Sequence, residues 1–178
     1  RVICNSSAVA DSIGRSAVQG PSPPTIIPPP LATLSVARAD SRPTSGAPFT
    51  ACGCGRLAPE KDWSTLLRAF AALRGHVGGA ARLIHLGDGQ LRESLHELAC
   101  ELGIAGDVEW RGTIAHEEVL GTLATADVFV LPSRFEGLGM AAVEAMQCGV
   151  PTITADFASS YDLLDHGRTG HRFSCGDW

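Results

Sequence analysis

The chain has 178 residues and no apolar run near the about 18 residues of a membrane-spanning helix, which fits one soluble domain. Its net charge of −5 argues against broad electrostatic attraction to nucleic acid. Nucleic acid is therefore excluded as an expected partner, and any phosphate site must be local.

The six cysteines are scattered, and only Cys52 and Cys54 lie close together in the sequence. No CxxC pair and no zinc-ligand spacing is present, so we expect neither disulfides nor a metal site. We interpret the cysteines as reduced core residues. Reduced cysteines favour a cytoplasmic location, and peripheral attachment at the inner face of the membrane stays open.

The N-terminal part of the chain differs in composition from the rest. The first residues, RVICN, predict a short strand, and 6–15 predict a weak helix. Eight prolines in 20–48 leave an extended linker with one edge strand at 25–27. Arg1 in place of Met, and a last residue close behind a predicted strand, suggest a fragment. The expected domains are the end of an N-terminal domain (1–19), a Pro/Ser-rich interdomain linker (20–48) and a ligand-binding domain truncated at its C-terminus (49–178).

Beyond Phe49, short apolar runs of strand length alternate with longer segments of helical periodicity. This alternation predicts a doubly wound, mostly parallel, Rossmann-like α/β sheet, whose ligands bind beyond the carboxyl ends of the strands. Ser159 and Asp162 form a capping-box pattern at the start of the last predicted helix. The predicted strands are 49–54, 81–86, 107–111, 127–131, 151–155 and 171–174, and the predicted helices are 62–74, 90–102, 116–125, 139–148 and 159–166.

The segment PSRFEGLGMAAVEAMQCGVP at 132–151 carries two glutamates. Glu144 lies on an apolar helix with no basic residue three or four positions away, so a buried carboxylate there needs a partner from another element. The alternative, that Glu144 lies on an exposed stripe of the helix, stays open. Glu136 precedes two glycines that let backbone approach a ligand, and the N–H groups of 137–140 open a helix whose dipole favours phosphate. A diphosphate would fit here.

A second loop, CGCGRLAPEKDW, follows the first strand of the domain and carries two cations. Arg56 and Lys61 could neutralise a diphosphate at the carboxyl end of that strand. The same segment also matches the dinucleotide-binding pattern G-x-G-x-x-G/A, and Asp88 stands where a ribose-binding acid would be. An NAD-type oxidoreductase domain is therefore the alternative, although Pro59 to Lys61 lengthen the turn before the helix. Capping of the next helix explains Asp88 equally well.

These segments, together with LGDGQLRESLHELACELGIAGDVEWRGTI and DHGRTGHRF, resemble the C-terminal domain of family 4 glycosyltransferases with the GT-B fold. The resemblance covers roughly residues 49 to 176. It implies a retaining transferase that moves a sugar from a nucleoside-diphosphate-sugar donor to a glycan, lipid or small-molecule acceptor. It further implies no resident cofactor and no metal, with the acceptor bound by an N-terminal domain missing from this chain. The fragment alone is expected to bind donor weakly and not to turn over.

The resemblance also assigns roles to residues of the motifs quoted above. Glu136 and Glu144 resemble the family's E-x7-E pair, the first beside the donor sugar as the catalytic candidate and the second on the ribose hydroxyls. The turn from Trp110 to Gly112 would lie against the base. Asp162 stands near a family glutamate, and Asp62 replaces a common glycine as an expected helix cap. The donor-binding residues implied are Arg56, Lys61, Arg111, Gly137, Leu138, Gly139, Met140 and Glu144.

Overall fold

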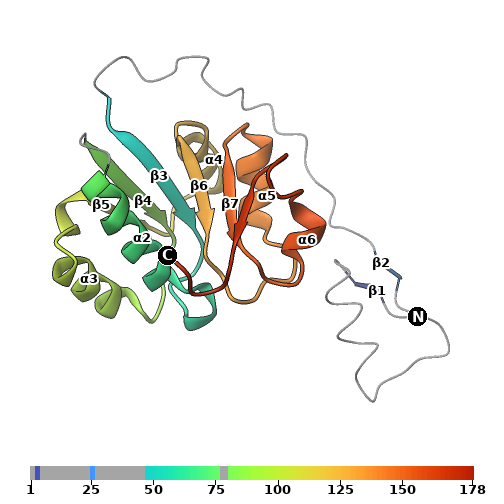
Figure 1. Cartoon of the computed structure of the whole chain (residues 1–178), viewed down its shortest axis with the longest axis horizontal. Helices are drawn as coiled ribbons and strands as arrows, with labels where there is room; N and C mark the ends of the chain where they lie inside the picture. The colour runs from blue at the N-terminus through green and yellow to red at the C-terminus, as the bar shows by residue number, and fades with distance from the viewer. Residues whose placement is uncertain (1–2, 5–24, 27–46, 77–79) are drawn as a thin grey trace.

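In the computed structural model, residues 3–4, 25–26, 47–76 and 80–178 are described. They form a six-stranded, fully parallel sheet with the strand order β5-β4-β3-β6-β7-β8 (Figure 1). A separate pair of short parallel strands, β1 (Ile3–Cys4) and β2 (Thr25–Ile26), lies outside this sheet. The six strands are β3 (Phe49–Cys54), β4 (Ala81–Leu86), β5 (Val108–Gly112), β6 (Val128–Leu131), β7 (Thr152–Ala155) and β8 (His171–Phe173).

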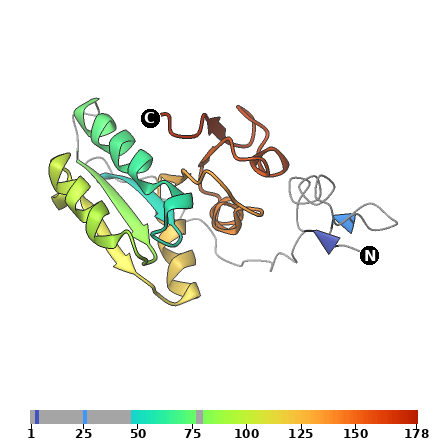
Figure 2. The same ribbon diagram turned by 90° about the horizontal axis from the view of Figure 1, so that it is seen from below.

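Helices lie on both sides of the strands, as Figure 2 shows. α2 packs against α3, and α4 packs against α5. Right-handed crossovers account for the two layers: the chain moves one way from β3 and the opposite way from β6, so the connecting helices fall on opposite faces. The helices are α2 (Trp63–His76), α3 (Arg92–Glu101), α4 (His116–Ala124), α5 (Met140–Gln147) and α6 (Ser160–Leu163), with 3-10 turns at Pro59–Lys61 and Ala105–Asp107.

The core is built by the apolar stripes that the sequence periodicity predicts. Trp63, Leu67 and Phe70 of α2 are almost fully buried, and they face a sheet whose strands are themselves apolar. On the opposite layer, α5 buries the small residues Ala142 and Ala145 completely. Small side chains let this helix lie close to β6 and β7, which brings the loop before α5 close to the sheet edge.

The strands and helices predicted for 49–178 are confirmed, with bounds that differ by a few residues. The strand predicted near the N-terminus and the edge strand near Thr25 correspond to β1 and β2. The helix predicted at 6–15, and most of the linker predicted at 20–48, lie outside the described residues, so the division into domains stays a prediction.

Two capping predictions are wrong, and the third residue has an additional role. Ser159 has a helical rather than extended backbone, and its hydroxyl donates to the Glu136 carbonyl, so the capping box with Asp162 does not form and α6 has only four residues. Asp88 does not cap α3, which begins at Arg92 after Leu91. Asp62 does precede α2, but it also accepts a hydrogen bond from Arg134 of a distant loop.

The cysteines are only partly core residues. Cys52 and Cys148 are buried and Cys54 is half-buried, whereas Cys100 and Cys175 are exposed. The prediction of core positions is therefore wrong for the last two: Cys100 falls on the outer face of α3, and Cys175 follows the edge strand β8.

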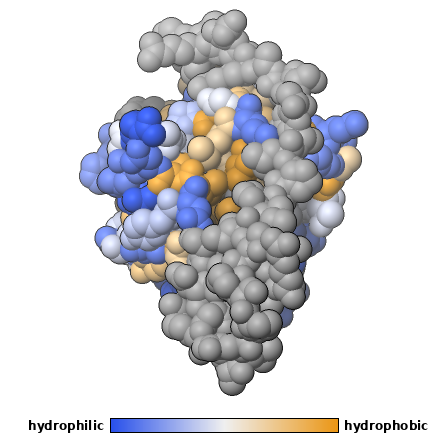
Figure 3. All heavy atoms as spheres, turned by 90° about the vertical axis from the view of Figure 1, so that its right-hand side faces the viewer, coloured by the Kyte–Doolittle hydropathy of each residue, from blue (hydrophilic) through white to orange (hydrophobic). Residues whose placement is uncertain are grey.

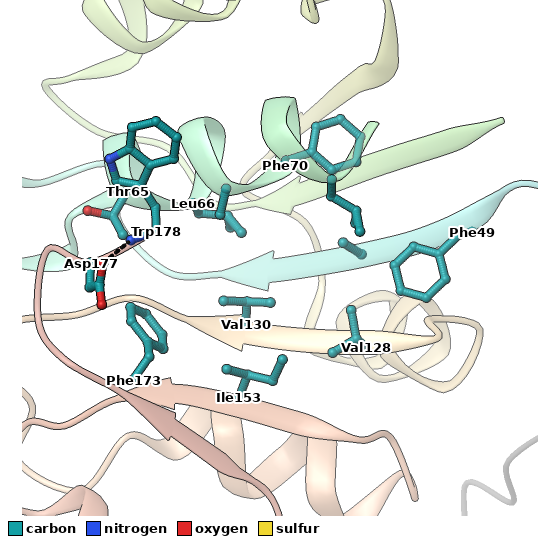
Figure 4. A pocket seen from close by; sticks show the side chains of 13 residues that line it. Phe49, Thr65, Leu66, Phe70, Val128, Val130, Ile153, Phe173, Asp177 and Trp178 are labelled. Atoms are coloured by element: carbon teal, nitrogen blue, oxygen red, sulfur yellow. Dashed lines mark hydrogen bonds between the residues drawn. The ribbon is translucent and has the colours of Figure 1, made fainter. Parts of the chain in front are cut away.

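An apolar cavity of about 490 Å³ lies between α2 and the sheet (Figure 4). Its lining comes from α2, β3, β6 and β7, with Phe173, Asp177 and Trp178 at one end. Seen from the side of α5 and α6, the surface shows apolar residues gathered among hydrophilic ones (Figure 3). The cavity lacks the cluster of cations and amides that phosphate needs. Lys61 lies instead in the loop at the carboxyl end of β3.

Candidate functional site

The two central strands, β3 and β6, mark the point where the strand order reverses. Ligands of doubly wound sheets bind in the crevice beyond the carboxyl ends of such strands. Two loops leave the sheet here: residues 55–62 follow β3, and residues 132–139 follow β6. These two loops carry the predicted cations, Arg56 and Lys61, and the first glutamate of the pair, Glu136. They are neighbours because β3 and β6 are paired.

Lys61 and Glu136 meet across this crevice. The Lys61 Nζ donates to Glu136 Oε1 at 2.5 Å, although the two residues are 75 positions apart. Their side chains are 17% and 13% exposed, so the pair is largely withdrawn from water but still reachable. Two opposite charges at this depth compensate each other's desolvation. A ligand that enters here meets a cation and a carboxylate held side by side.

Glu136 is held by more than Lys61. The Ser133 hydroxyl donates to the same Oε1 at 2.8 Å, and the Ser159 hydroxyl donates to the Glu136 backbone carbonyl at 2.9 Å. Ser133 and Ser159 are both fully buried. These two serines are positioning residues that the sequence reading did not identify. Only the spacing of Ser133 from Glu136 offered a signal, since a side chain three positions earlier in a turn lies close to it.

The loop after β6 ends at Gly139, whose lack of a side chain lets α5 begin close to a ligand. Gly139 precedes α5 with φ 79°, a left-handed conformation that side chains disfavour. A Cβ there would lie 3.2 Å from Leu131 and 3.4 Å from Phe157, so a side chain would also be crowded. The first amides of α5 therefore open toward the loop that carries Glu136, Gly137 and Leu138, and the helix dipole there favours an anion. Met140, the first helical residue, is exposed.

Glu144 lies on α5, eight residues after Glu136. Its side chain is 21% exposed, and His116 Nε2 of α4 lies 3.9 Å from its carboxylate. Burial raises the pKa of Glu144, and His116 offsets this only in part. The Cys54 thiol at the end of β3 has its pKa raised to about 11 by burial and by the Glu144 carboxylate, while Lys61 acts in the opposite direction. Glu144 and Lys61 therefore both lie near the carboxyl end of β3.

The structure does not bring the predicted arginines to the same point. Arg56 is 76% exposed in its side chain and pairs with Glu60 at 2.9 Å. Arg111 points back along its own strand, where it contacts Glu109 at 2.7 Å and the Thr122 hydroxyl of α4 at 2.7 Å. Both remain predicted donor contacts, but each would first have to leave the partner that it has in this structure.

The loops after β3, β4 and β5 are joined through backbone. Gly87 N donates to the Gly112 carbonyl at 2.7 Å, and Leu57 N donates to the Asp88 carbonyl at 3.1 Å. The loops after β3 and β4 come this close only because residue 87 is a glycine: a Cβ on Gly87 would lie 2.1 Å from the Gly55 carbonyl oxygen. A hydrogen bond from Gly89 N and the neighbouring Arg92 lower the pKa of Asp88. The predicted base-binding turn at Gly112 is thus connected to the first loop of the site.

Comparison with known proteins decides the family. The family described as glycosyl transferases group 1 matches residues 40–178, which is well over half of the chain. The chain belongs to this family. The predicted resemblance is therefore confirmed, as is the α/β fold with a parallel, doubly wound sheet.

Several curated members of the glycosyl transferase group 1 family resemble the chain. A GDP-mannose-dependent alpha-(1-6)-phosphatidylinositol monomannoside mannosyltransferase of Mycolicibacterium smegmatis is 34% identical over 174 residues, 92% of this chain and 45% of that protein. The lipopolysaccharide core biosynthesis glycosyltransferase LpsE of Rhizobium meliloti is 33% identical over 123 residues, 69% of this chain and 34% of that protein. The chain thus spans less than half the length of these relatives.

Solved structures of glycosyltransferases share the fold. Anabaena Alr3699/HepE in complex with UDP and glucose has a TM-score of 0.84 at 23% identity, over 99% of this chain and 50% of that one. The lipopolysaccharide outer core galactosyltransferase WaaB has a TM-score of 0.80 at 24% identity, over 98% of this chain and 48% of that one. At such identities the likeness establishes the fold, and it does so over about half of each neighbour.

The alternative of an NAD-type oxidoreductase is not supported by this group 1 domain. The dinucleotide-binding pattern requires the helix to begin within its glycine triplet. Here a 3-10 turn at Pro59–Lys61 intervenes, and α2 begins only at Trp63. The match of Gly53, Gly55 and Ala58 is therefore accidental.

Neither a membrane-spanning helix nor a metal-binding cluster is found in the described part of the chain. Among residues 3–4, 25–26, 47–76 and 80–178, no helix is long and apolar enough to cross a membrane. Over the same ranges, no cluster of three or more His, Cys, Asp or Glu side chains could hold a metal ion.

Proposed function

We propose that this chain binds the nucleoside-diphosphate-sugar donor of a retaining glycosyltransferase, as the C-terminal half of a two-domain enzyme. The contact between Lys61 and Glu136, beside the N-terminus of α5, carries the proposal. A diphosphate linked to a sugar needs a cation and amides for its phosphates and a carboxylate for its hydroxyls. The two loops after β3 and β6, with the first amides of α5, bring all three together.

The roles of these residues follow from where charge develops during sugar transfer. As the nucleoside diphosphate leaves, negative charge grows on its outer phosphate and positive charge grows on the sugar. The Lys61 ammonium and the α5 amides stabilise the leaving group, and preorganised donors of this kind contribute several kcal/mol, on the order of 3 each. Glu136, fixed by Ser133 and Ser159, orients the sugar. The acceptor attacks the same face from which the diphosphate departs.

Glu144 fits a different part of the donor. Among the described residues, its half-buried carboxylate is paired only with His116, at 3.9 Å, so the ribose hydroxyls would provide the hydrogen bonds that it lacks. Arg56 closes on the diphosphate after leaving Glu60, and the turn from Trp110 to Gly112 receives the base. Asp162, on the exposed face of α6, contacts the donor only if the sugar extends toward that helix.

The names of similar proteins support the class of donor. The mannosyltransferase of Mycolicibacterium smegmatis is described as dependent on GDP-mannose, and HepE is described in complex with UDP and glucose. We infer a nucleoside-diphosphate sugar without a resident cofactor or metal. The acceptor is a glycan, lipid or small molecule held by the other domain. A cytoplasmic enzyme, peripheral at the inner membrane face, is consistent with a lipid acceptor.

Calorimetric titration of the chain with UDP, GDP, ADP and NAD tests the proposal. At least one nucleoside diphosphate should bind more tightly than NAD, because the loop after β3 lacks the geometry of a dinucleotide-binding site. Tighter binding of NAD would contradict the proposal. In the complete gene product, Glu136→Ala should abolish sugar transfer but leave diphosphate binding within a few-fold, and unchanged transfer would remove the role of Glu136.

A further inference from the structure

Asp62 has an unusual backbone conformation. With φ 49° and ψ 44°, it is the one non-glycine residue in the described ranges with a positive φ. Side-chain-bearing residues adopt this conformation at an energetic cost, which glycine avoids. The Asp62 side chain is nevertheless only 4% exposed. An aspartate held in this position therefore has contacts that compensate for its backbone.

The two oxygens of the Asp62 carboxylate serve different purposes. Oδ1 accepts from the Ser64 hydroxyl at 2.8 Å, within the first turn of α2. Oδ2 accepts from Arg134 Nε at 2.9 Å, and Arg134 belongs to the loop after β6. The first contact serves the helix start, as a cap does, whereas the second joins the two loops of the site.

Three consecutive residues of the first loop contact the second loop. The Glu60 carbonyl accepts from Arg134 N at 2.9 Å, Lys61 contacts Glu136 at 2.5 Å, and Asp62 contacts the Arg134 side chain. Arg134 thus grips the residues on both sides of Lys61. Its side chain is 64% exposed, so the ion pair with Asp62 adds little to global stability. The main effect of the ion pair is to fix the position of Lys61.

We infer that the Asp62–Arg134 ion pair is a clasp that positions the Lys61 ammonium against Glu136, and thereby sets the affinity of the site for diphosphate. Asp62 and Arg134 are positioning residues, since neither needs to touch the donor. The clasp itself rests on the contacts above. Its effect on diphosphate affinity rests in addition on the proposed function.

The sequence allows a direct test of Lys61. Lys61 is the sole lysine among the 178 residues, so amine modification reports on it and on the N-terminal amine, which serves as an internal reference. Reductive methylation, followed by peptide mass analysis, measures its accessibility. Arg134→Leu and Asp62→Asn should each raise the rate at Lys61 about 5-fold, and the double variant should add little more. Asp62→Asn keeps an oxygen for the Ser64 hydroxyl.

The matched control is Arg168→Leu. Arg168 pairs with Asp165 at 2.5 Å on an exposed turn away from the two loops, and its side chain is 77% exposed. This variant should leave the rate at Lys61 unchanged while costing as little thermal stability as Arg134→Leu. An unchanged rate at Lys61 in both clasp variants would overturn the inference. So would an equal increase in the control.

Calorimetry supplies the second readout. Arg134→Leu should weaken binding of the nucleoside diphosphate roughly 5- to 10-fold and leave binding of the free nucleoside unchanged, because only the phosphates contact Lys61. Equal losses for both ligands would overturn the inference, because they would indicate general damage. If Lys61 is released in the variants but the parent chain binds no nucleoside diphosphate, the clasp stands and the proposed function fails.

Discussion

Lys61 and Glu136 form an ion pair that is largely withdrawn from water. Each is more than four-fifths buried, and Ser133 adds a hydrogen bond to the same carboxylate oxygen. Removing one partner of such a pair leaves an uncompensated charge, whereas removing both leaves two neutral groups. Glu144 carries part of this cost in the structure itself, since burial raises its pKa and His116, 3.9 Å away, offsets this only in part.

At the residue scale, this predicts the stability of variants of the pair. Lys61→Met should lower the free energy of unfolding by about 1 to 3 kcal/mol, because Glu136 loses its counter-charge. The double variant Lys61→Met/Glu136→Gln should recover most of that loss, although it cannot bind donor. Urea denaturation of the parent and of the two variants measures both the loss and the recovery. A double variant that is less stable than Lys61→Met would contradict this account.

The elements that form the site are short loops, and glycines set how closely they pack. Gly87 places the loop after β4 on the loop after β3, and the backbone bonds Gly87–Gly112 and Leu57–Asp88 extend this contact. The left-handed Gly139 starts α5 beside Glu136. Ser159 donates to the loop that carries Glu136 instead of capping α6, and Asp62 accepts from Arg134 of the same loop in addition to its contact at the start of α2.

At the scale of elements, Gly87→Ala should destabilise the protein. Its φ is 123°, and a Cβ would lie 2.1 Å from the Gly55 carbonyl oxygen, so the two loops must separate. We expect a loss of at least about 2 kcal/mol in the free energy of unfolding. Gly121→Ala is the matched control: this helical glycine has open space around it, and alanine should stabilise α4 by roughly 0.5 to 1 kcal/mol. Similar losses in both variants would refute the packing argument.

The core of the molecule contains a buried titratable group, His85, next to Trp110 of the predicted base-binding turn. His85 of β4 is 2% exposed and lies against Trp63 of α2, with ring centroids 4.4 Å apart, and against Trp110 of β5 at 5.4 Å. Burial lowers its pKa to about 4. The ring of His85 thus lies where a helix and two strands of the core meet, so its protonation affects the stability of the fold.

At the scale of the whole molecule, acid should destabilise the protein through His85. The unfolded chain protonates this ring near pH 6.5 and the folded chain only near pH 4, so its contribution is complete above pH 6.5 and is lost as pH falls toward 4. The total loss is roughly 3 kcal/mol. In His85→Phe, the difference between urea midpoints at pH 7.5 and pH 4.5 should shrink accordingly. An undiminished difference would exclude His85 as the cause.

The sequence by itself determined the order and type of the elements and most of the residues of the site. The spacing of apolar residues predicted the six strands and the amphipathic α2, because that periodicity is local. Glu144 on an apolar helix and the glycines beside Glu136 were equally visible in the sequence. These features depend on residues within a few positions of one another.

Only the tertiary structure decided which charges meet. Lys61 and Glu136 are 75 residues apart, and their contact depends on β3 and β6 being neighbours at the point where the strand order reverses. For the same reason, no local pattern indicated that Arg134 would grip Asp62, or that Ser159 would serve Glu136 rather than α6. Arg56 was predicted beside Lys61, but its nearest carboxylate is Glu60, one helical turn away. Sequence spacing identifies which groups can act, and strand order determines which of them lie side by side.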